Sequence, residues 1–181
     1  MSAGHGHIDP SNKKIALLIA VLALVLAFSE TLGKSAQTNA LSLNIEASNL
    51  WSFFQAKTIR QTVVRTAAEQ TSLTGNSEEA KKQIEAWRKT AQRYQTEPET
   101  GEGRDELMAR AKEAEKKRDR SMAAYHQYEL ASAAVQIAIV LASAAIVTGA
   151  MALAWIGAGL GVLGLVFCLI GFLAPTAVHL F

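Results

Sequence analysis

The sequence has little cysteine and little proline. Cys168 is the only cysteine, which excludes an internal disulfide and a zinc site built from several thiolates. Only 3 prolines occur in 181 residues, and none lies between Lys34 and Thr74. Long uninterrupted helices are therefore compatible with most of the chain, because proline is the residue that most strongly ends a helix.

Charge is missing from two long stretches. Residues 15–29 and 130–181 contain no Asp, Glu, Lys or Arg, although the chain has 18 basic and 16 acidic residues. A uniform soluble domain is excluded, because uncharged segments of this length offer no surface that water solvates well. The net charge of +2, with interleaved signs, also excludes a strongly basic nucleic-acid-binding protein. We expect no nucleic-acid partner.

Motifs for catalysis are scarce as well. The sequence contains no nucleophile elbow, no phosphate-binding loop and no Cys/His arrangement with metal-ligand spacing. His5 and His7 form a pair that binds a metal only weakly without further ligands. Residues 159–164 match the glycine spacing of a dinucleotide-binding loop, but no strand precedes them and no acidic residue follows. We therefore predict no catalytic residue, no metal site and no cofactor, and we expect no enzyme.

Three apolar runs are long enough to cross a membrane: residues 15–33, residues 130–148 and residues 151–173. Only Gly149 and Ala150 separate the last two, which predicts a transmembrane hairpin within residues 130–181, followed by a short C-terminus. Residues 1–14 are expected to form a disordered tail. The first run also fits a secretory signal peptide with a cleavage site at Ala27-Phe28-Ser29, and this alternative stays open.

The charged region between the first two runs, residues 34–129, is expected to be a helical stalk. The first helix is expected to continue out of the membrane to Thr74, with Gly75 in a left-handed conformation and Ser77 capping the next helix. Pro98 lies in a loop that interrupts the return path. The predicted fold class is an all-α membrane protein, with three transmembrane helices and a long, coiled-coil-like extramembrane stalk between the first and second. Apolar positions at four-three spacing are Ala36, Ala40, Leu43, Ala47, Leu50 and Phe54, followed on a slightly rotated stripe by Ile59, Val63 and Ala67.

Small residues line one face of each helix in the predicted hairpin. In lipid, helices gain nothing from hydrophobic burial, so close backbone contact across small side chains has to hold them together. The predicted helix-packing residues are Gly157, Gly161, Gly164 and Gly171 on the third span, and Ala138, Ala142 and Ala145 on the second. Two polar residues of the spans, Glu30 and Gln136, are candidates either for an ion path or for structural hydrogen bonds.

Two stretches carry a family resemblance. Residues 46–57, Glu-Ala-Ser-Asn-Leu-Trp-Ser-Phe-Phe-Gln-Ala-Lys, follow the first span, and residues 136–143, Gln-Ile-Ala-Ile-Val-Leu-Ala-Ser, open the second. Both resemble signatures of a bacterial membrane-protein family known as domain of unknown function 4337. Asn49 stands where the family signature has an acid, and Phe53 and Phe54 stand where it has tyrosines. The resemblance covers most of the chain and implies a bacterial membrane location without an activity.

The first of these stretches also contains candidate interface residues, namely Trp51, Phe53, Phe54, Gln55 and Lys57. At helical spacing these side chains fill the core of the stalk or a subunit interface, or they bind a partner or a ligand. If the helix turns along the membrane, the aromatic rings instead anchor it in lipid. The sequence leaves these alternatives open.

The expected function is that of a homo-oligomeric membrane scaffold or interaction protein without catalytic activity. A stalk of thin helices buries little apolar surface, which favours self-association. The alternative is an oligomeric channel or a transport accessory subunit. The expected partners are membrane lipid, further copies of the chain and a protein that the sequence does not identify.

The distribution of basic residues bears on orientation in the bacterial inner membrane. Lys13 and Lys14 flank the first span on the tail side. The stalk side carries more cations near the membrane, which predicts a cytoplasmic stalk, although dominance of the first helix argues for the opposite. These cations are Lys34, Arg110, Lys112, Lys116, Lys117, Arg118 and Arg120.

Overall fold

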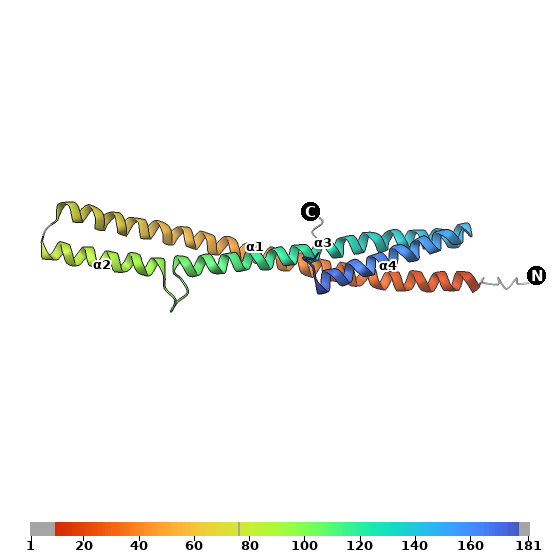
Figure 1. Ribbon diagram of the computed structural model, residues 1–181. Coiled ribbons are helices and arrows are strands. Elements are labelled where there is room, and N and C mark those ends of the chain that lie inside the picture. Colours follow the sequence, from red (N-terminus) through yellow and green to blue (C-terminus); the bar gives the residue numbers. More distant parts are fainter. Residues whose placement is uncertain (1–9, 76, 178–181) are drawn as a thin grey trace, which may run out of the picture. The chain divides into compact units, whose positions relative to one another are not determined.

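The structure, a computed structural model, describes residues 10–75 and 77–177 (Figure 1). Within these residues the chain forms four helices and no strand, so the fold is all-α. The helices are α1 (Pro10–Thr74), α2 (Glu78–Gln95), α3 (Arg104–Thr148) and α4 (Met151–Leu173).

Three of the helices are long and apolar enough to cross a membrane: α1, within Asn12–Thr74, α3 and α4. The apolar runs of α1 and α3 are not separate helices, because each continues into a charged segment without a break. Helix α1 begins at Pro10. Proline fits the first turn of a helix because backbone amides there have no hydrogen-bond acceptor within the helix, so the amide hydrogen that proline lacks is not needed. Residues 10–14, expected in the tail, are therefore helical, whereas His5 and His7 lie outside the described residues.

Helix ends follow local chemistry. Ser77 caps α2, since its hydroxyl accepts a hydrogen bond from the Ala80 amide at 3.1 Å, and acidic Glu78 and Glu79 occupy the first turn. Gly149, at φ +72°, makes the turn between α3 and α4. The left-handed conformation expected at Gly75 is wrong: its φ lies outside that region, and its amide donates to the Thr71 carbonyl at 2.8 Å.

The chain divides into two compact units. The apolar unit consists of Met1–Ala40 and Asp119–Phe181, and the charged unit of Leu41–Arg118. The charged unit is shorter than the expected stalk of residues 34–129. Residues at both ends of that range pack within the apolar unit, where the Asn39 amide donates to the Ser121 hydroxyl at 2.9 Å.

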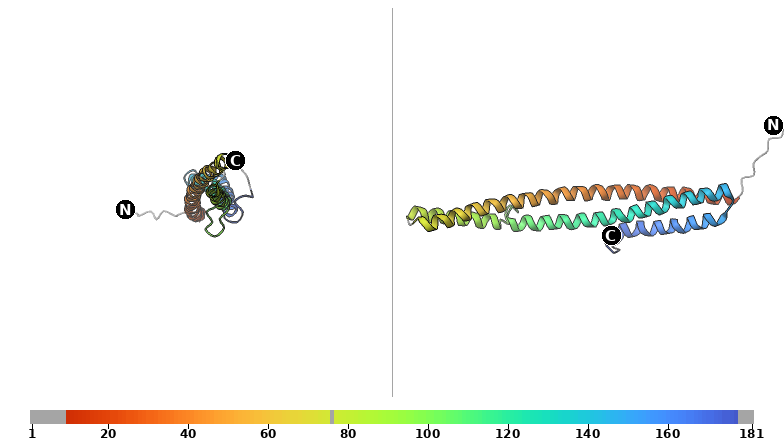
Figure 2. Two further views of the ribbon diagram at one scale, coloured as in Figure 1. Left: turned by 90° about the vertical axis from the view of Figure 1, so that its left-hand side faces the viewer. Right: turned by 90° about the horizontal axis from the view of Figure 1, so that it is seen from above.

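In the apolar unit, the first part of α1, the second part of α3 and the whole of α4 lie side by side (Figures 1 and 2). Two clusters of buried residues hold them together. One joins Ile15 to alanines of α3 and α4, and the other joins Leu22 to Val135 and Ala138. Because most of the buried α3 residues are alanines, the helix axes can approach closely.

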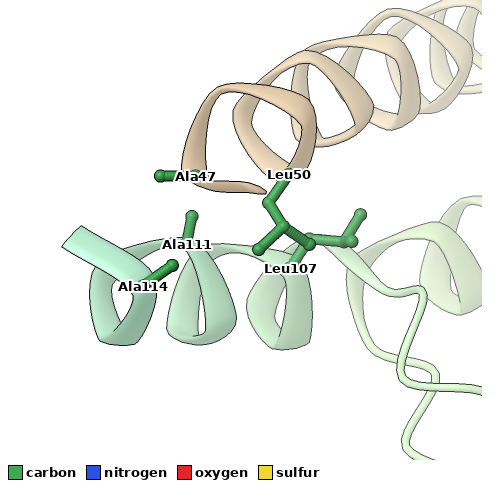
Figure 3. Packing of buried hydrophobic residues seen from close by; sticks show 5 residues of the cluster. All are labelled: Ala47, Leu50, Leu107, Ala111 and Ala114. Atoms are coloured by element: carbon green, nitrogen blue, oxygen red, sulfur yellow. The ribbon is translucent and has the colours of Figure 1, made fainter. Parts of the chain in front are cut away.

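In the charged unit, the second part of α1 packs on α2 and on the first part of α3. The core is small and rich in alanine (Figure 3), and it consists of Ala47, Leu50, Leu107, Ala111 and Ala114. The loop at Pro98 separates α2 from α3, as the sequence predicts. Leu50 and Leu107 supply the large side chains of this core, so little apolar area is buried per residue.

The inner face of α1 differs from the expected stripe beyond Phe54. Ile59 and Val63, expected to continue it, are 65% and 62% exposed. Lys57 and Gln61 are buried instead, because they keep the seven-residue register of Ala47 and Leu50. The packing of α1 on α2 therefore includes two polar side chains, and the residues that contact them form a candidate functional site.

Candidate functional site

Lys57 is the centre of a buried ionic cluster in the charged unit. Its side chain is 7% exposed, and its Nζ lies 3.6 Å from Glu97 Oε2 and 3.5 Å from Glu102 Oε2. The same Nζ lies 5.3 Å from the centre of the Phe53 ring and 5.5 Å from that of Tyr94. Two carboxylates and two ring faces thus replace the water that the ammonium loses on burial.

A second polar group lies beside this Lys57 cluster and joins α1, α2 and the start of α3. Gln61 Nε2 donates to the Ala91 carbonyl at 3.0 Å, and Gln61 Oε1 accepts from Arg104 Nη1 at 2.6 Å. Arg104 Nη1 also donates to Gln95 Oε1 at 3.0 Å, and its guanidinium stacks 4.9 Å from the centre of the Phe54 ring. The amides orient the guanidinium, and the ring covers one side of it.

The loop between α2 and α3 is tied at both ends. Asp105 accepts from Gln95 Nε2 at 2.7 Å and from the Thr96 hydroxyl at 2.9 Å, while Glu106 accepts from the Glu97 amide at 3.2 Å. Gly103 is required at its position, because an added Cβ would meet the Glu97 amide nitrogen at 2.5 Å. Together with Lys57, these contacts hold the loop against α1.

Of the five candidate interface residues, four face the interior of the charged unit. Trp51 Nε1 donates to Glu115 Oε1 at 2.9 Å, and the Trp51 and Phe54 rings meet edge to face at 5.4 Å. Phe53 and Lys57 belong to the Lys57 cluster, and only Gln55 is exposed. The four inward residues position the loop and α3 on α1. Their rings are packed, and the Lys57 ammonium lies beside two carboxylates.

The space left between α1 and α2 is a shallow groove. It has a volume of about 520 Å³ and is lined by residues that include Gln61, Arg65, Glu69, Arg88 and Gln95. Within residues 10–75 and 77–177, no group of three His, Cys, Asp or Glu side chains is placed to hold a metal ion.

The outward face of α1 is a feature that the sequence reasoning missed. Among the described residues of the charged unit, the large aliphatic side chains classed as exposed all lie on α1, with exposed fractions from 54% to 86%. All but Val63, which lies outside this repeat, could have been found by noting that α1 has a second set of residues at seven-residue spacing, offset from the buried set. These side chains are Leu41, Ile45, Ile59, Val63 and Leu73.

In the apolar unit, the structure places two of the candidate glycines against the second part of α3. A Cβ added to Gly157 would meet the Ala138 carbonyl oxygen at 2.9 Å and the Ala142 nitrogen at 3.5 Å. A Cβ on Gly164 would meet Val135 Cγ2 at 2.5 Å and the Ala131 carbonyl at 3.1 Å. At Gly157 the backbones of α3 and α4 approach closely because alanines of α3 face the glycine, whereas at Gly164 the absence of a side chain also leaves room for Val135.

The remaining candidates of the small-residue seams have other neighbours. Gly161 faces the Leu22 side chain of α1, and Gly171 faces the Tyr128 ring, 3.0 Å from an added Cβ. Ala145 belongs to the buried cluster that contains Ile15 of α1. The small residues of α3 and α4 therefore serve contacts with α1 as well as contacts with each other.

The two intramembrane polar candidates lie together. Gln136 Nε2 donates to Glu30 Oε1 at 3.3 Å, and both side chains are exposed on the apolar unit. Next to Glu30, Ser29 is fully buried. The pair links α1 to α3 by a hydrogen bond near one end of the apolar run of each helix.

These features define a class: an all-helical protein that combines apolar helices of membrane-spanning length with a charged helical unit. Residues 11–174 match the family described as domain of unknown function (DUF4337), and the chain belongs to this family. No curated protein and no solved structure matches the chain.

Proposed function

We propose that the protein is a homo-oligomeric membrane scaffold or interaction protein of the bacterial inner membrane, without catalytic activity. Residues 15–33, 130–148 and 151–173 would cross the membrane, and residues 34–129 would form an extramembrane stalk. The observation that carries the self-association is the exposure of Leu41, Ile45, Ile59, Val63 and Leu73, all on one helix of the charged unit.

The apolar unit supports the membrane part of this proposal. Its exposed side chains include Leu17, Leu24, Phe28, Trp155 and Phe172. Each large apolar side chain left in water costs about 1.5–3 kcal/mol relative to burial, so a lipid environment stabilises this surface. The single hydrogen bond between Glu30 and Gln136 lies close to the charged continuation of α1, where lipid headgroups and water can solvate it.

The charged unit supports the interaction part. Its core is dominated by alanine, so the unit gains little stability from its own burial. Exposed aliphatic residues on α1 would gain free energy from a partner surface, at roughly 25 cal/mol per Å² of apolar area covered. A further protein partner, which no observation identifies, would bind the assembled stalk.

A channel or a transport accessory subunit is the second candidate, because the Glu30–Gln136 pair is exposed on the apolar unit. If copies of α1 surrounded a pore, this pair would supply polar groups to its lining.

Reconstitution separates the two functions. The full-length protein, purified in a mild detergent, is expected to elute as one defined oligomer by size exclusion with light scattering. The same protein in liposomes is expected to cause no ion flux above that of empty liposomes. Flux that is lost in the Glu30→Ala variant would favour the channel, and a monomer under all conditions would contradict both functions.

A further inference from the structure

Helix α1 has two faces within the charged unit. The inner face is buried at Ala47, Leu50, Lys57, Gln61 and Ala68, whose successive spacings of three, seven, four and seven follow one seven-residue register. A second set in the same repeat, displaced to the opposite side of the helix, is exposed at every position. We call this set the outer stripe: Leu41, Ile45, Ser48, Ser52, Gln55, Ile59, Thr62, Thr66, Glu69 and Leu73.

The outer stripe is almost without charge. Glu69 is the single ionisable residue among its ten members. The exposed face of α2, by contrast, includes Glu78, Lys81, Glu85 and Lys89, whose charges pair along the helix and face water. A regular exposed stripe with a single charge, on a unit whose other helices carry many ions, has the distribution of a helix that pairs through that stripe.

We propose that the outer stripe binds the outer stripe of a second copy of this chain, with the two α1 helices parallel and in register. This inference rests on the proposed membrane scaffold, because two copies anchored in one membrane with the same orientation hold their α1 helices parallel and at the same height. Each member of the stripe then faces its own counterpart. A strict seven-residue repeat is the spacing that keeps such a seam closed along a left-handed supercoil.

The chemistry of the stripe suits this pairing. Ile45, Ile59 and Leu73 lie fourteen residues apart and form apolar layers with their counterparts. Ser48, Ser52, Thr62 and Thr66 lie between them, where short side chains allow close approach and hydroxyls can hydrogen-bond across the seam. Gln55 is the one long amide in the middle of the stripe. An amide facing its counterpart is satisfied only when the helices are in register, so it selects the parallel, unshifted arrangement.

The size of the stripe explains why anchoring matters. Residues 41–73 extend about 48 Å at ~1.5 Å per residue, and a strip about 10 Å wide along them is roughly 500 Å² per copy. A stable interface between two soluble proteins usually needs about 800 Å² per partner. The stripe alone is therefore too small for a tight soluble dimer, and the high local concentration of anchored copies makes up the difference.

Cysteine crosslinking of the full-length protein in native membranes tests the arrangement. In a Cys168→Ser background, Ser52→Cys and Thr66→Cys each place one thiol on the outer stripe. The control, Arg60→Cys, places an exposed thiol on the same helix beside the stripe. With mild oxidation we expect a reducible dimer from each stripe variant and none from the control, since thiols whose Cα atoms are more than about 7 Å apart cannot form a disulfide.

Two further measurements make the outcome decisive. The oligomer size of each variant is measured in detergent by light scattering. Chains with Ser48→Cys and chains with Thr66→Cys are coexpressed with different tags. A disulfide between the two kinds of chain, without a disulfide between chains of the same kind, indicates an antiparallel pair and overturns the inference. An intact oligomer without any stripe crosslink also overturns the inference but leaves the proposed scaffold standing. A monomer without crosslinks overturns both.

Discussion

Lys57 occupies a position of α1 where the seven-residue register directs the side chain inward. An ammonium group placed there loses most of its water. The carboxylates of Glu97 and Glu102 and the ring faces of Phe53 and Tyr94 take the place of that water. The lysine therefore links the loop to α1 instead of extending into water from the helix surface. Gln61, one turn further on, has the same inward position and satisfies its amide with Ala91 and Arg104.

Replacement of this lysine tests the coupling. Lys57→Met keeps the length of the side chain but leaves Glu97 and Glu102 without their shared cation, and we expect a loss of about 1–3 kcal/mol in the stability of the full-length protein. The estimate is below that for a fully buried pair because Glu102 is half exposed. Thermal unfolding in detergent, followed by circular dichroism, measures the change as a lower midpoint.

Lys81→Met is the matched control for this substitution. Lys81 pairs with Glu78 at 2.8 Å, a shorter distance than those at Lys57, but both partners are more than 60% exposed. Solvent screens such a pair, so its loss is expected to cost no more than about 0.5 kcal/mol. Equal midpoints for the two variants would show that the burial of Lys57 contributes nothing.

At the scale of the helical elements, α4 offers two glycines that share a helix and differ in surroundings. Gly157→Ala places a methyl group 2.9 Å from the Ala138 carbonyl oxygen, so α3 and α4 have to separate, at a cost of about 1–3 kcal/mol. Gly159→Ala meets nothing within 4 Å, and the higher helix propensity of alanine makes it neutral or slightly stabilising.

Retention of the monodisperse fraction after heating in detergent compares these two variants. Gly157→Ala is expected to lose that fraction at a lower temperature than the wild type, and Gly159→Ala at the same or a slightly higher temperature. If both behaved like the wild type, the close approach of α4 to α3 at Gly157 would not contribute to stability.

The helical elements could be predicted because their limits depend on local chemistry. Ser77 caps α2, Pro98 lies in the loop that follows it, and Gly149 makes the turn before α4, and each of these effects acts within a few residues. Continuity of α1 follows from the absence of proline and glycine between Lys34 and Thr74. These signals need no knowledge of which helix lies beside which.

The choice of inner face could not be predicted in the same way. Apolar Ile59 and Val63 were expected to continue the stripe, but they are exposed, and Lys57 and Gln61 are buried. Burial of these polar residues depends on Glu97, Gln95 and Arg104, which are more than thirty residues away in sequence. Likewise, the periodicity of α4 identified its small-residue face, whereas the contact of Gly161 with Leu22 depends on how α1 packs.

For the whole molecule, the separation of charge from apolar surface bears on topology. A chain with apolar runs at residues 15–33, 130–148 and 151–173 would place the loop at Pro98 and the turn at Gly149 on opposite sides of a membrane if all three runs cross it. Cations near the membrane are more numerous on the side of the loop, including Lys112, Lys116 and Lys117. By the positive-inside rule we predict a cytoplasmic loop, whereas dominance of the first helix predicts the opposite side.

Single cysteines at these two places test that topology in a Cys168→Ser background. Glu99→Cys lies in the exposed loop and Ala150→Cys in the exposed turn before α4. In intact spheroplasts we expect an impermeant maleimide to label Ala150→Cys and to leave Glu99→Cys unlabelled until the membrane is permeabilised, because a charged reagent does not cross the hydrocarbon core. The reverse pattern would keep three crossings and move the charged unit to the outer side. If both cysteines, or neither, were labelled before permeabilisation, the loop and the turn would lie on the same side of the membrane. The chain between them would then not cross the membrane an odd number of times, and the predicted topology would be wrong.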